Sequence, residues 1–417
     1  MAVPDFRRVV VTGLGAVTPV GNDVPAMWRS LLAGTSGVGP ISCFDAGALE
    51  SRIAAEVKGF DPAQYLSPKE IKRSERFVQF AIAAGKQAVA DAGLTGAPAD
   101  PFRFGVVIGT GIGSMHLIEQ QHSTLVAKGP KRLSPFMIPM LICNMAPGQV
   151  AMDLGWKGPN FCTTSACASG AHGLGEAFRI IQRGLADVML GGGTESCITP
   201  LTVGGFCALM ALSRRNDEPA KASRPFDKER DGFVIGEGAG VLVLEELEHA
   251  KRRGARIYAE MAGYGATADA FHMTAPDPEG AGAAKAMAMA LEDARMRPDQ
   301  VSYLNAHGTS TDLNDKIETL AIKATFKDAA KRVAVSSTKS MMGHLIGGAG
   351  GVEGVISVLA IRDGVMPPTI NYEHPDPACD LDYIPNEARK APVEAVVSNS
   401  LGFGGHNATV VFRKFSG

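Results

Sequence analysis

Short apolar runs without polar alternation recur along the chain. They predict strands that are buried on both faces, at residues 8–13, 104–109, 186–191 and 240–244. Alanine-rich stretches with apolar residues at helical spacing predict helices at residues 77–92, 171–183, 282–295, 313–326 and 348–362. Strands that alternate with helices are typical of a layered α/β protein.

The second half of the chain repeats the pattern of the first. Residues 8–16 resemble residues 256–266, and residues 163–172 resemble residues 335–344. Chance similarity between glycine- and alanine-rich segments is the alternative, but the matching order favours duplication. We therefore predict two similar halves, 1–253 and 254–417, that pack as one body.

Composition narrows the class of protein. The 417 residues carry 41 Lys and Arg against 43 Asp and Glu, so no global positive field favours nucleic acid as a partner. The seven cysteines contain no CxxC pair, as expected in a reducing compartment. No apolar segment approaches the length of a membrane span, and none at the N-terminus is typical of a signal peptide. We expect a cytoplasmic protein with no membrane partner.

Cys167 is the candidate nucleophile. It lies among small residues in the segment 158–172, immediately before a predicted helix. The N-terminus of a helix lowers a thiol pKa from about 8.5, which favours a reactive thiolate. The remaining cysteines are interpreted as small buried apolar residues, namely Cys43, Cys143, Cys162, Cys197, Cys207 and Cys379.

Three further turns rich in glycine or hydroxyl residues carry candidate partners. His307 lies at the end of a predicted strand in the segment 303–311, while Lys339 and His344 surround a helix start. Such turns after strands are where ligands of α/β sheets bind. A structural role is the alternative for each histidine, and a surface ammonium for Lys339. In the third turn, glycines on both sides of Phe403 allow close backbone approach and allow its ring to move.

These motifs resemble a known family. TSACASG around Cys167, NAHGTST around His307, SSTKSMMGH from 336 to 344 and GFGG at 402–405 are similar to β-ketoacyl-acyl carrier protein synthases, over essentially the whole chain. The segment 269–274 resembles the type II elongating branch. The Cys–His–His combination differs from the Cys–His–Cys of thiolases and the Cys–His–Asn of initiating synthases. The resemblance implies an α/β, thiolase-like, duplicated five-layer αβαβα fold with two mixed β-sheets.

The resemblance also implies an activity, a decarboxylative Claisen condensation in fatty acid elongation. Cys167 would carry the acyl chain as a thioester, with the backbone N–H groups of Cys167 and Phe403 as the oxyanion hole. His307 and His344 would stabilise the enolate that forms when malonyl-acyl carrier protein loses CO2. The expected product is 3-oxoacyl-acyl carrier protein, the expected partners are acyl carrier protein and a second copy of the chain, and no cofactor is expected.

Further residues receive roles through the same resemblance. Ile112 would line the acyl pocket, and Thr309 and Thr311 would contact the pantetheine arm. Lys339 would orient the site or hold Glu318. Other substrate contacts are expected at His272 and Thr274, a buried polar network at Asp315 and Glu318, and a structural monovalent cation at Asn305, Ala306, Glu353, Ser398 and Asn399.

A basic segment is the candidate docking site for the acidic carrier protein. The spacing of Lys69, Lys72, Arg73 and Arg76 predicts one face of a helix over 68–76, and an ordinary solvated basic face is the alternative. Two further arginines, Arg214 and Arg215, would extend this surface.

Departures from the family pattern concern two properties. Met137 stands where a bulky aromatic residue is common and His406 where threonine is common, and these leave the acyl chain length open. Met210 stands where relatives often carry an arginine for carrier-protein docking. Three alternative functions are weighed. A discrete polyketide ketosynthase shares every catalytic residue, a non-catalytic chain-length factor would lack Cys167, and a thiolase would carry a second cysteine.

Overall fold

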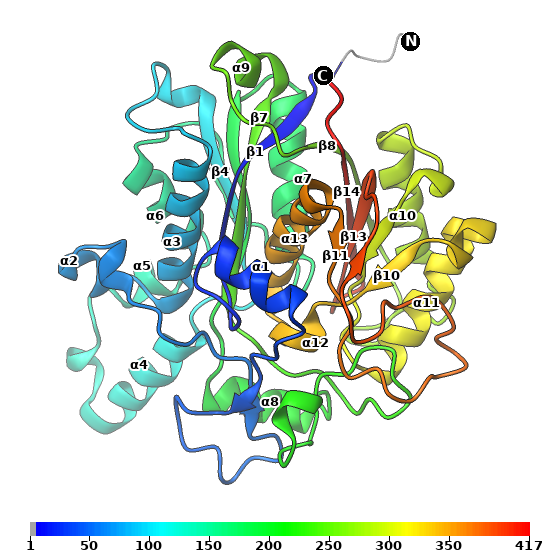
Figure 1. Cartoon of the computed structure of the whole chain (residues 1–417). Coiled ribbons are helices and arrows are strands. Elements are labelled where there is room, and N and C mark those ends of the chain that lie inside the picture. The colour runs from blue at the N-terminus through cyan, green and yellow to red at the C-terminus, as the bar shows by residue number, and fades with distance from the viewer. Residues whose placement is uncertain (1–5) are drawn as a thin grey trace.

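The computed structural model describes residues 6–417, and a ten-stranded sheet forms its centre (Figure 1). The strand order is β10-β9-β13-β14-β8-β1-β7-β6-β4-β5. Its strands are β1 (Val9–Val17), β4 (Phe104–Gly109), β5 (Asn160–Phe161), β6 (Val188–Glu195), β7 (Gly238–Glu246), β8 (Ala259–Ala268), β9 (Tyr303–Asn305), β10 (Ala334–Ser336), β13 (Ala395–Gly402) and β14 (His406–Arg413). Two small sheets pair β2 (Gly39–Pro40) with β3 (Ile53–Ala54) and β11 (Val365–Met366) with β12 (Arg389–Lys390).

The large sheet consists of two mixed halves that meet at its centre. Strand β1 pairs with β8 over three residue pairs, Val9–Val11 against Ala259–Met261, so the two predicted sheets join edge to edge. Counting only strands of the large sheet, each half has the order third, second, fourth, fifth, first. This equality supports duplication, while the boundary at residue 253 stays a prediction.

Helices form three layers around the two halves of the sheet (Figure 1). Helices α7 and α13 lie between the halves, α3 and α6 cover the outer face of the first, and α10 and α11 cover that of the second. Helix α13 is buried on all sides from Ala349 to Ile361, as its apolar composition requires for a central position. The helices are α1 (Val24–Leu32), α2 (Pro68–Ile71), α3 (Arg76–Asp91), α4 (Met115–Lys128), α5 (Met137–Leu141), α6 (Met145–Leu154), α7 (Ser169–Gln182), α8 (Pro200–Ala208), α9 (Leu247–Arg252), α10 (Ala281–Asp293), α11 (Asp312–Phe326), α12 (Lys339–Met342) and α13 (Ala349–Asp363).

Close packing of a helix on the first strand explains the sequence echo between the halves. A Cβ atom on Gly15 of β1 would lie 1.9 Å from the carbonyl oxygen of Ala84 on α3. A Cβ atom on Gly265 of β8 would lie 2.1 Å from the carbonyl oxygen of Ala286 on α10. Each first strand therefore needs glycine where the backbone of its covering helix approaches.

The predicted basic helix over 68–76 is wrong. Helix α2 ends at Ile71, and α3 begins at Arg76 after a turn. Ser67 and Glu70 form a capping box at the start of α2, and the Ser74 hydroxyl donates to the Glu70 carbonyl at 2.8 Å. Arg76 therefore leaves the predicted face, and its Nη2 atom pairs with Oε1 of Glu237 at 2.8 Å.

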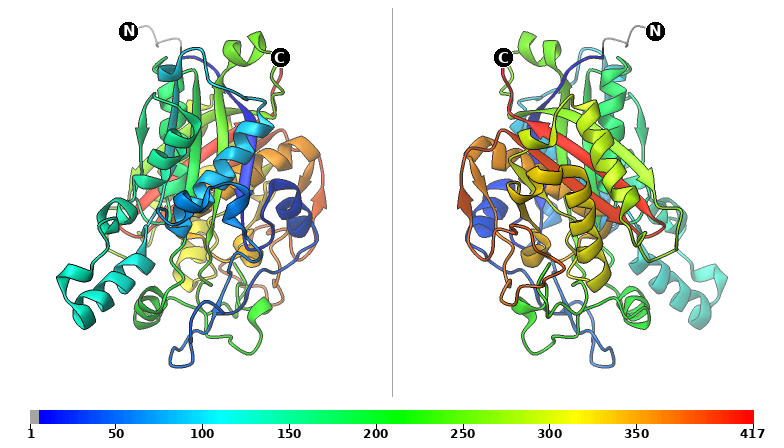
Figure 2. Two further views of the ribbon diagram at one scale, coloured as in Figure 1. Left: turned by 90° about the vertical axis from the view of Figure 1, so that its left-hand side faces the viewer. Right: turned by 90° about the vertical axis from the view of Figure 1, so that its right-hand side faces the viewer.

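Helices α4 and α5 project from the body of the molecule (Figure 2). Across residues 6–417, no helix combines the length and the apolar character that crossing a membrane requires.

Candidate active site

A cavity of about 500 Å³ lies where strands and loops of both halves meet. It is lined by residues that follow the parallel strands β4 and β9, and by the end of β13, which pairs in parallel with β9. Ligand sites of α/β proteins form at such carboxyl ends. Eight predicted site residues line this cavity, namely Ile112, Cys167, Thr274, His307, Thr309, Thr311, His344 and Phe403.

Cys167 lies in the tight turn between β5 and α7, with Ala166 at a φ of 50° before it. The residue is 8% exposed, and this burial raises the pKa of its thiol to about 12. The charge of Lys339 and the backbone N–H of Phe403 act in the opposite direction on that pKa. The predicted location at the start of α7 is right, but the predicted low thiol pKa is wrong because burial outweighs these contributions.

Two buried imidazoles face the thiol. The Sγ atom of Cys167 and a ring nitrogen each of His307 and His344 lie within 4.8 Å of one another. The two rings are 5.2 Å apart between centroids and inclined by 85°. Burial, followed by the charge of Lys339, lowers the pKa of both histidines well below its usual value. Both are therefore neutral near pH 7, and a neutral imidazole N–H can donate a hydrogen bond to a substrate oxygen.

The backbone around each histidine is fixed. Glu318 on α11 accepts hydrogen bonds from the backbone N–H groups of His307 and Gly308, each at 2.8 Å. Burial raises the pKa of Glu318 to about 7. The backbone N–H of His344 donates to the carbonyl of Val234 at 2.7 Å. Within residues 6–417, neither ring nitrogen of His344 has a hydrogen-bond partner, so both are free for a ligand.

Lys339 is buried at 1% exposure, which excludes the surface ammonium. Its Nζ atom forms an ion pair with Glu353 on α13, which is buried as well. The expected contact with Glu318 is therefore wrong, since Glu318 binds the backbone after β9 instead. Lys339 places a positive charge beside the thiol and both imidazoles, where it acts on the pKa of each.

Phe403 stands at the tip of the β13–β14 hairpin and is 36% exposed. A Cβ atom on Gly402 would lie 2.8 Å from the carbonyl of Ser165, so the hairpin presses on the nucleophile turn. Gly404 has a φ of 84°, which favours glycine. The hairpin also contacts the loop after β8, because the N–H of Asp269 donates to the carbonyl of Gly405 at 2.9 Å.

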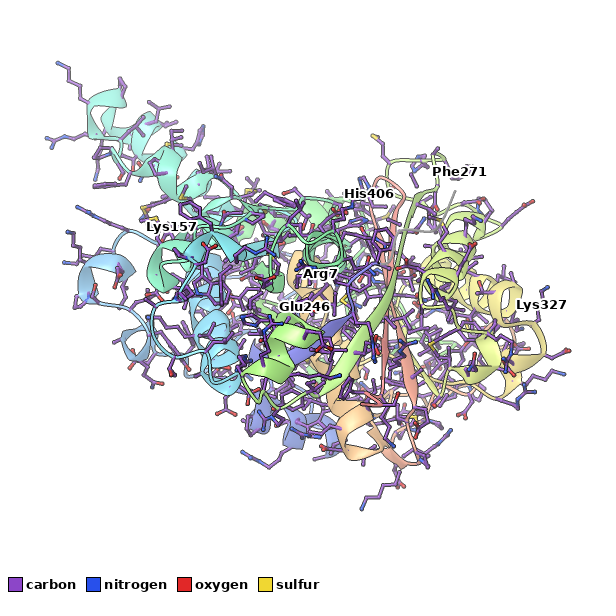
Figure 3. All side chains as sticks on the ribbon, turned by 90° about the horizontal axis from the view of Figure 1, so that it is seen from above. Arg7, Lys157, Glu246, Phe271, Lys327 and His406 are labelled. Atoms are coloured by element: carbon purple, nitrogen blue, oxygen red, sulfur yellow. The ribbon has the colours of Figure 1, made fainter. Side chains whose placement is uncertain are left out.

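Two of the predicted residues lie apart from the reacting groups. His272 is exposed, and its Nδ1 atom accepts from the backbone N–H groups of Thr274 and Ala275, each at 3.1 Å, so it closes its own loop. His406 is close to this loop, because it pairs with Ala268 at the end of β8, and Figure 3 labels it near Phe271. Asp315 is buried, and it accepts from the backbone N–H of Phe226 at 2.8 Å.

The residues expected to hold a cation include buried polar atoms, and the cation itself stays a prediction. Both amide atoms of Asn305 and the Oε2 atom of Glu353 are buried without a hydrogen-bond partner among the described residues. Each of the two oxygens could accept a cation or a donor. The side chain of Asn399 does not fit, because its amide nitrogen contacts Glu318 at 3.3 Å and its oxygen accepts from Thr409 at 2.9 Å. Ala306 and Ser398 are buried beside these residues in the sequence.

The docking candidates Lys69, Lys72 and Arg73 are exposed. The guanidinium of Arg73 lies 4.6 Å from the ring centroid of Phe136, so it covers part of an apolar surface. The proposed extension is weaker, since Arg214 pairs with Glu50 and Arg215 pairs with Glu229.

Sequence reasoning missed Glu195, a fully buried carboxylate beside the cavity wall. Its position at the end of an apolar strand, in the run Gly191-Gly-Gly-Thr-Glu195, was the available signal, because an ionisable residue there is costly to bury.

Two models of one protein family match this chain and together cover most of it. The N-terminal domain of β-ketoacyl synthases matches residues 6–250, and the C-terminal domain of the same family matches residues 258–373. The chain belongs to the β-ketoacyl synthase family.

Curated relatives named 3-oxoacyl-acyl-carrier-protein synthase 2 are similar over the full length. The relative from Synechocystis sp. is 55% identical over 415 residues, and the match covers 100% of both chains. The relative from Coxiella burnetii is 55% identical over 408 residues, covering 98% of this chain and 99% of its own. The predicted activity, a condensing acyltransferase of fatty acid elongation, is thereby confirmed.

Solved structures confirm the predicted thiolase-like α/β fold. A β-ketoacyl synthase from Burkholderia phymatum superposes with a TM-score of 0.92 at 38% identity, covering 98% of this chain and 100% of that one. The structure of a type II polyketide acyl-carrier protein in complex with its ketosynthase gives a TM-score of 0.91 at 38% identity. The match covers 99% of this chain and 100% of the matched chain.

Proposed function

We propose that Cys167, His307 and His344 carry out the condensation, and the cluster of one thiol and two neutral imidazoles within 4.8 Å supports this assignment. In the first step the Cys167 sulfur attacks the thioester carbonyl of an acyl-carrier protein. The backbone N–H groups of Cys167 and Phe403 stabilise the oxyanion. The carrier thiol leaves with the proton that Cys167 loses, and the acyl chain stays on Cys167.

In the second step malonyl-carrier protein occupies the cavity. His307 and His344 donate hydrogen bonds to its thioester oxygen while the carbon–carbon bond to the carboxylate breaks and CO2 leaves. The electron pair of that bond forms the enolate, whose carbon attacks the acyl thioester on Cys167. The carbon–sulfur bond then breaks, giving a 3-oxoacyl product two carbons longer, and Cys167 regains a proton.

Lys339 and Glu318 act through other groups. The ammonium of Lys339 opposes the rise of the Cys167 pKa, and after burial it is the next contribution that lowers the pKa of both imidazoles. Glu318 holds the backbone of His307. Asn305 and Glu353 would help to hold a structural monovalent cation. The cation would contact the carboxylate oxygen of Glu353 that has no hydrogen-bond partner, and it would take no part in the chemistry.

Acyl carrier protein is the proposed macromolecular substrate, as the names of the relatives and the solved complex suggest. Thr309 and Thr311 are suited to its pantetheine arm because both line the cavity, with their hydroxyls 2.9 Å apart. The cytoplasmic location stays a prediction.

A homodimer is the proposed assembly. Segment 115–142 and β5 expose an apolar surface beside Met137, formed by Leu125, Val126, Phe136, Ile138, Ile142 and Phe161. Strand β5 is also an edge of the large sheet, where it pairs with β4 on one side. Such a surface and edge are suited to a second copy of the chain.

A polyketide pathway is the weaker alternative. The polyketide complex is 38% identical to this chain, whereas the synthases of fatty acid elongation reach 55%. The chain-length factor is excluded by the complete set of Cys167 and two histidines in one cavity.

A pair of variants tests the assignment by separating the two steps. Cys167→Ala should lose condensation by more than about 10³-fold while it still releases CO2 from malonyl-carrier protein. His344→Ala should still accept an acyl group on Cys167, detected by mass spectrometry, while CO2 release falls by roughly 10²–10³. Cys162→Ala, a half-buried thiol in the same segment, is the control and should behave like wild type. Equal loss of both steps in both variants would contradict the proposal.

A further inference from the structure

Glu195 is a buried carboxylate that the proposed reaction does not use. It ends β6, has 0% exposure and accepts five hydrogen bonds. Its Oε1 atom accepts from the hydroxyl of Thr110 at 2.8 Å and from the N–H of Gly113 at 3.2 Å. Its Oε2 atom accepts from the N–H groups of Gly111, Ile112 and Gly347 at 2.7, 3.2 and 3.1 Å.

These bonds join two loops that come from different halves of the molecule. The loop 110–113 follows β4 and carries Ile112, while Gly347 lies three residues after His344. The two loops touch directly, since a Cβ atom on Gly347 would lie 2.2 Å from the backbone nitrogen of Gly111. Ile112 and Ile346, one from each loop, line the cavity that holds Cys167.

The carboxylate is held without a cation. No basic side chain within residues 6–417 forms an ion pair with Glu195, and four of its five donors are backbone N–H groups. Successive N–H groups of Gly111, Ile112 and Gly113 form a concavity that binds an anion. By contrast Glu245, equally buried on neighbouring β7, binds Arg253 and His249. Glu195 therefore binds the backbone of the two loops and is not the anionic partner of a basic side chain.

The loops shape an apolar wall. Ile112 packs with Cys167, Ile346 and Phe233 in one apolar cluster beside the nucleophile. An acyl chain on Cys167 would contact this wall, and a longer chain would contact more of it.

We propose that Glu195 is a positioning residue for acyl-chain selection, because its carboxylate fixes Ile112 against the loop that follows His344. The inference rests on the proposed acyl loading of Cys167. A glutamine at this position keeps the volume but turns an amide N–H2 group toward N–H donors, so part of the clamp opens. Ile112 then gains freedom. The variant also removes a charge that raises the pKa of Cys167, but that change acts on every acyl substrate alike, so the ratio between substrates reports the clamp.

The test measures acyl loading of Cys167 in Glu195→Gln with dodecanoyl- and butyryl-carrier protein, as kcat/KM for each. The ratio of the long to the short substrate should fall by about tenfold, while CO2 release from malonyl-carrier protein changes less. Thr110→Val removes only one of the five bonds and should shift the ratio in the same direction by about two- to threefold. Glu245→Gln, the control at an equally buried carboxylate, should lower the melting temperature and leave the ratio unchanged.

Equal losses with both substrates, or an unchanged ratio, would overturn the proposal and leave Glu195 with a role in folding alone. If Glu195→Gln does not fold, Thr110→Val decides, and a wild-type ratio in that variant overturns the proposal. Wild-type enzyme that loads neither substrate would instead contradict the proposed function.

Discussion

The loops after β4 and β9 hold equivalent places in the two halves, since each follows the second strand of its half of the large sheet. A buried carboxylate binds the backbone N–H groups of each loop. In the first half Glu195 reaches the loop from the end of β6. In the second half Glu318 reaches it from α11, the helix that follows the same loop in sequence. In both halves a buried carboxylate therefore binds the backbone N–H groups of this loop, but the carboxylate comes from a strand in the first half and from a helix in the second.

The side chains that the two loops present differ, and so do their tasks. The first loop presents Ile112, an apolar side chain that lines the cavity. The second presents His307, a possible hydrogen-bond donor whose ring centroid is 5.2 Å from that of His344. Under the proposed function, the first loop would serve acyl-chain selection and the second would serve the chemistry. Breaking the clamp in each half should consequently damage different steps.

The largest effect is expected from the clamp of the second half. Glu318→Gln replaces one accepting oxygen by a donor that faces the backbone N–H of His307 or Gly308. We expect CO2 release from malonyl-carrier protein to fall by roughly 10², the cost of a misplaced catalytic group. Acyl loading of Cys167 should fall much less, opposite to the pattern for Glu195→Gln. Decarboxylation at the wild-type rate would show that Glu318 does not position His307.

The same variant should also change how the free energy of unfolding depends on pH. The pKa of Glu318 is raised by burial from 4.5 to about 7, so between these values the folded state holds a proton that the unfolded state has lost. The contribution of this group to the free energy of unfolding is fully present below pH 4.5 and is lost as pH rises through 7. Urea midpoints measured from pH 4.5 to 8 should show this decline in wild type and a smaller decline in Glu318→Gln.

A smaller effect is expected at the predicted gate, Phe403, which lines the same cavity. Gly404→Val places a branched side chain at a φ of 84°, where its Cβ atom would lie 3.1 Å from the ring of His406. Acyl loading in single-turnover measurements should slow by about tenfold, because Phe403 must move when the acyl chain enters. Gly129→Val is the matched control, since Gly129 has a φ of 79° and no atom within 4 Å of its Cβ position. A gate is excluded if both variants load at the wild-type rate.

The sequence predicted which side chains gather in the cavity better than it predicted their environment. Motif and turn chemistry singled out Cys167, His307 and His344 as candidates, and the structure brings them together within 4.8 Å. The pKa of Cys167 escaped prediction because a helix start is visible in sequence, whereas burial at 8% exposure depends on the β13–β14 hairpin that covers the turn. Similarly, both Glu318 and Glu353 lie on helices, and only the packing of α13 decides that Lys339 meets Glu353.

Local competition explains the failure at the basic segment. The spacing of Lys69, Lys72 and Arg73 fits a continuous helix, but Ser74 bonds back to the carbonyl of Glu70, and Glu75 is the residue before α3. A serine hydroxyl that bonds to the carbonyl four residues earlier bends or weakens a helix, which favours an end at this place over continuation. A charge pattern alone does not show such a break.

The smallest effect is expected at this basic surface, which lies in the first half and outside both clamps. Lys69→Glu with Lys72→Glu reverses two exposed charges. Exposed charges act mainly on the encounter with an acidic partner, and salt screens them beyond about 8–10 Å. We expect KM for carrier-protein substrates to rise by about three- to tenfold, with a weaker dependence on salt and an unchanged kcat. A short pantetheine thioester should react normally, because it does not touch the surface.

Lys327→Glu with Lys331→Glu, on exposed residues of the second half, is the charge-matched control and should leave KM unchanged. Equal losses with both kinds of substrate would show that residues 68–73 support the fold and do not bind the carrier protein.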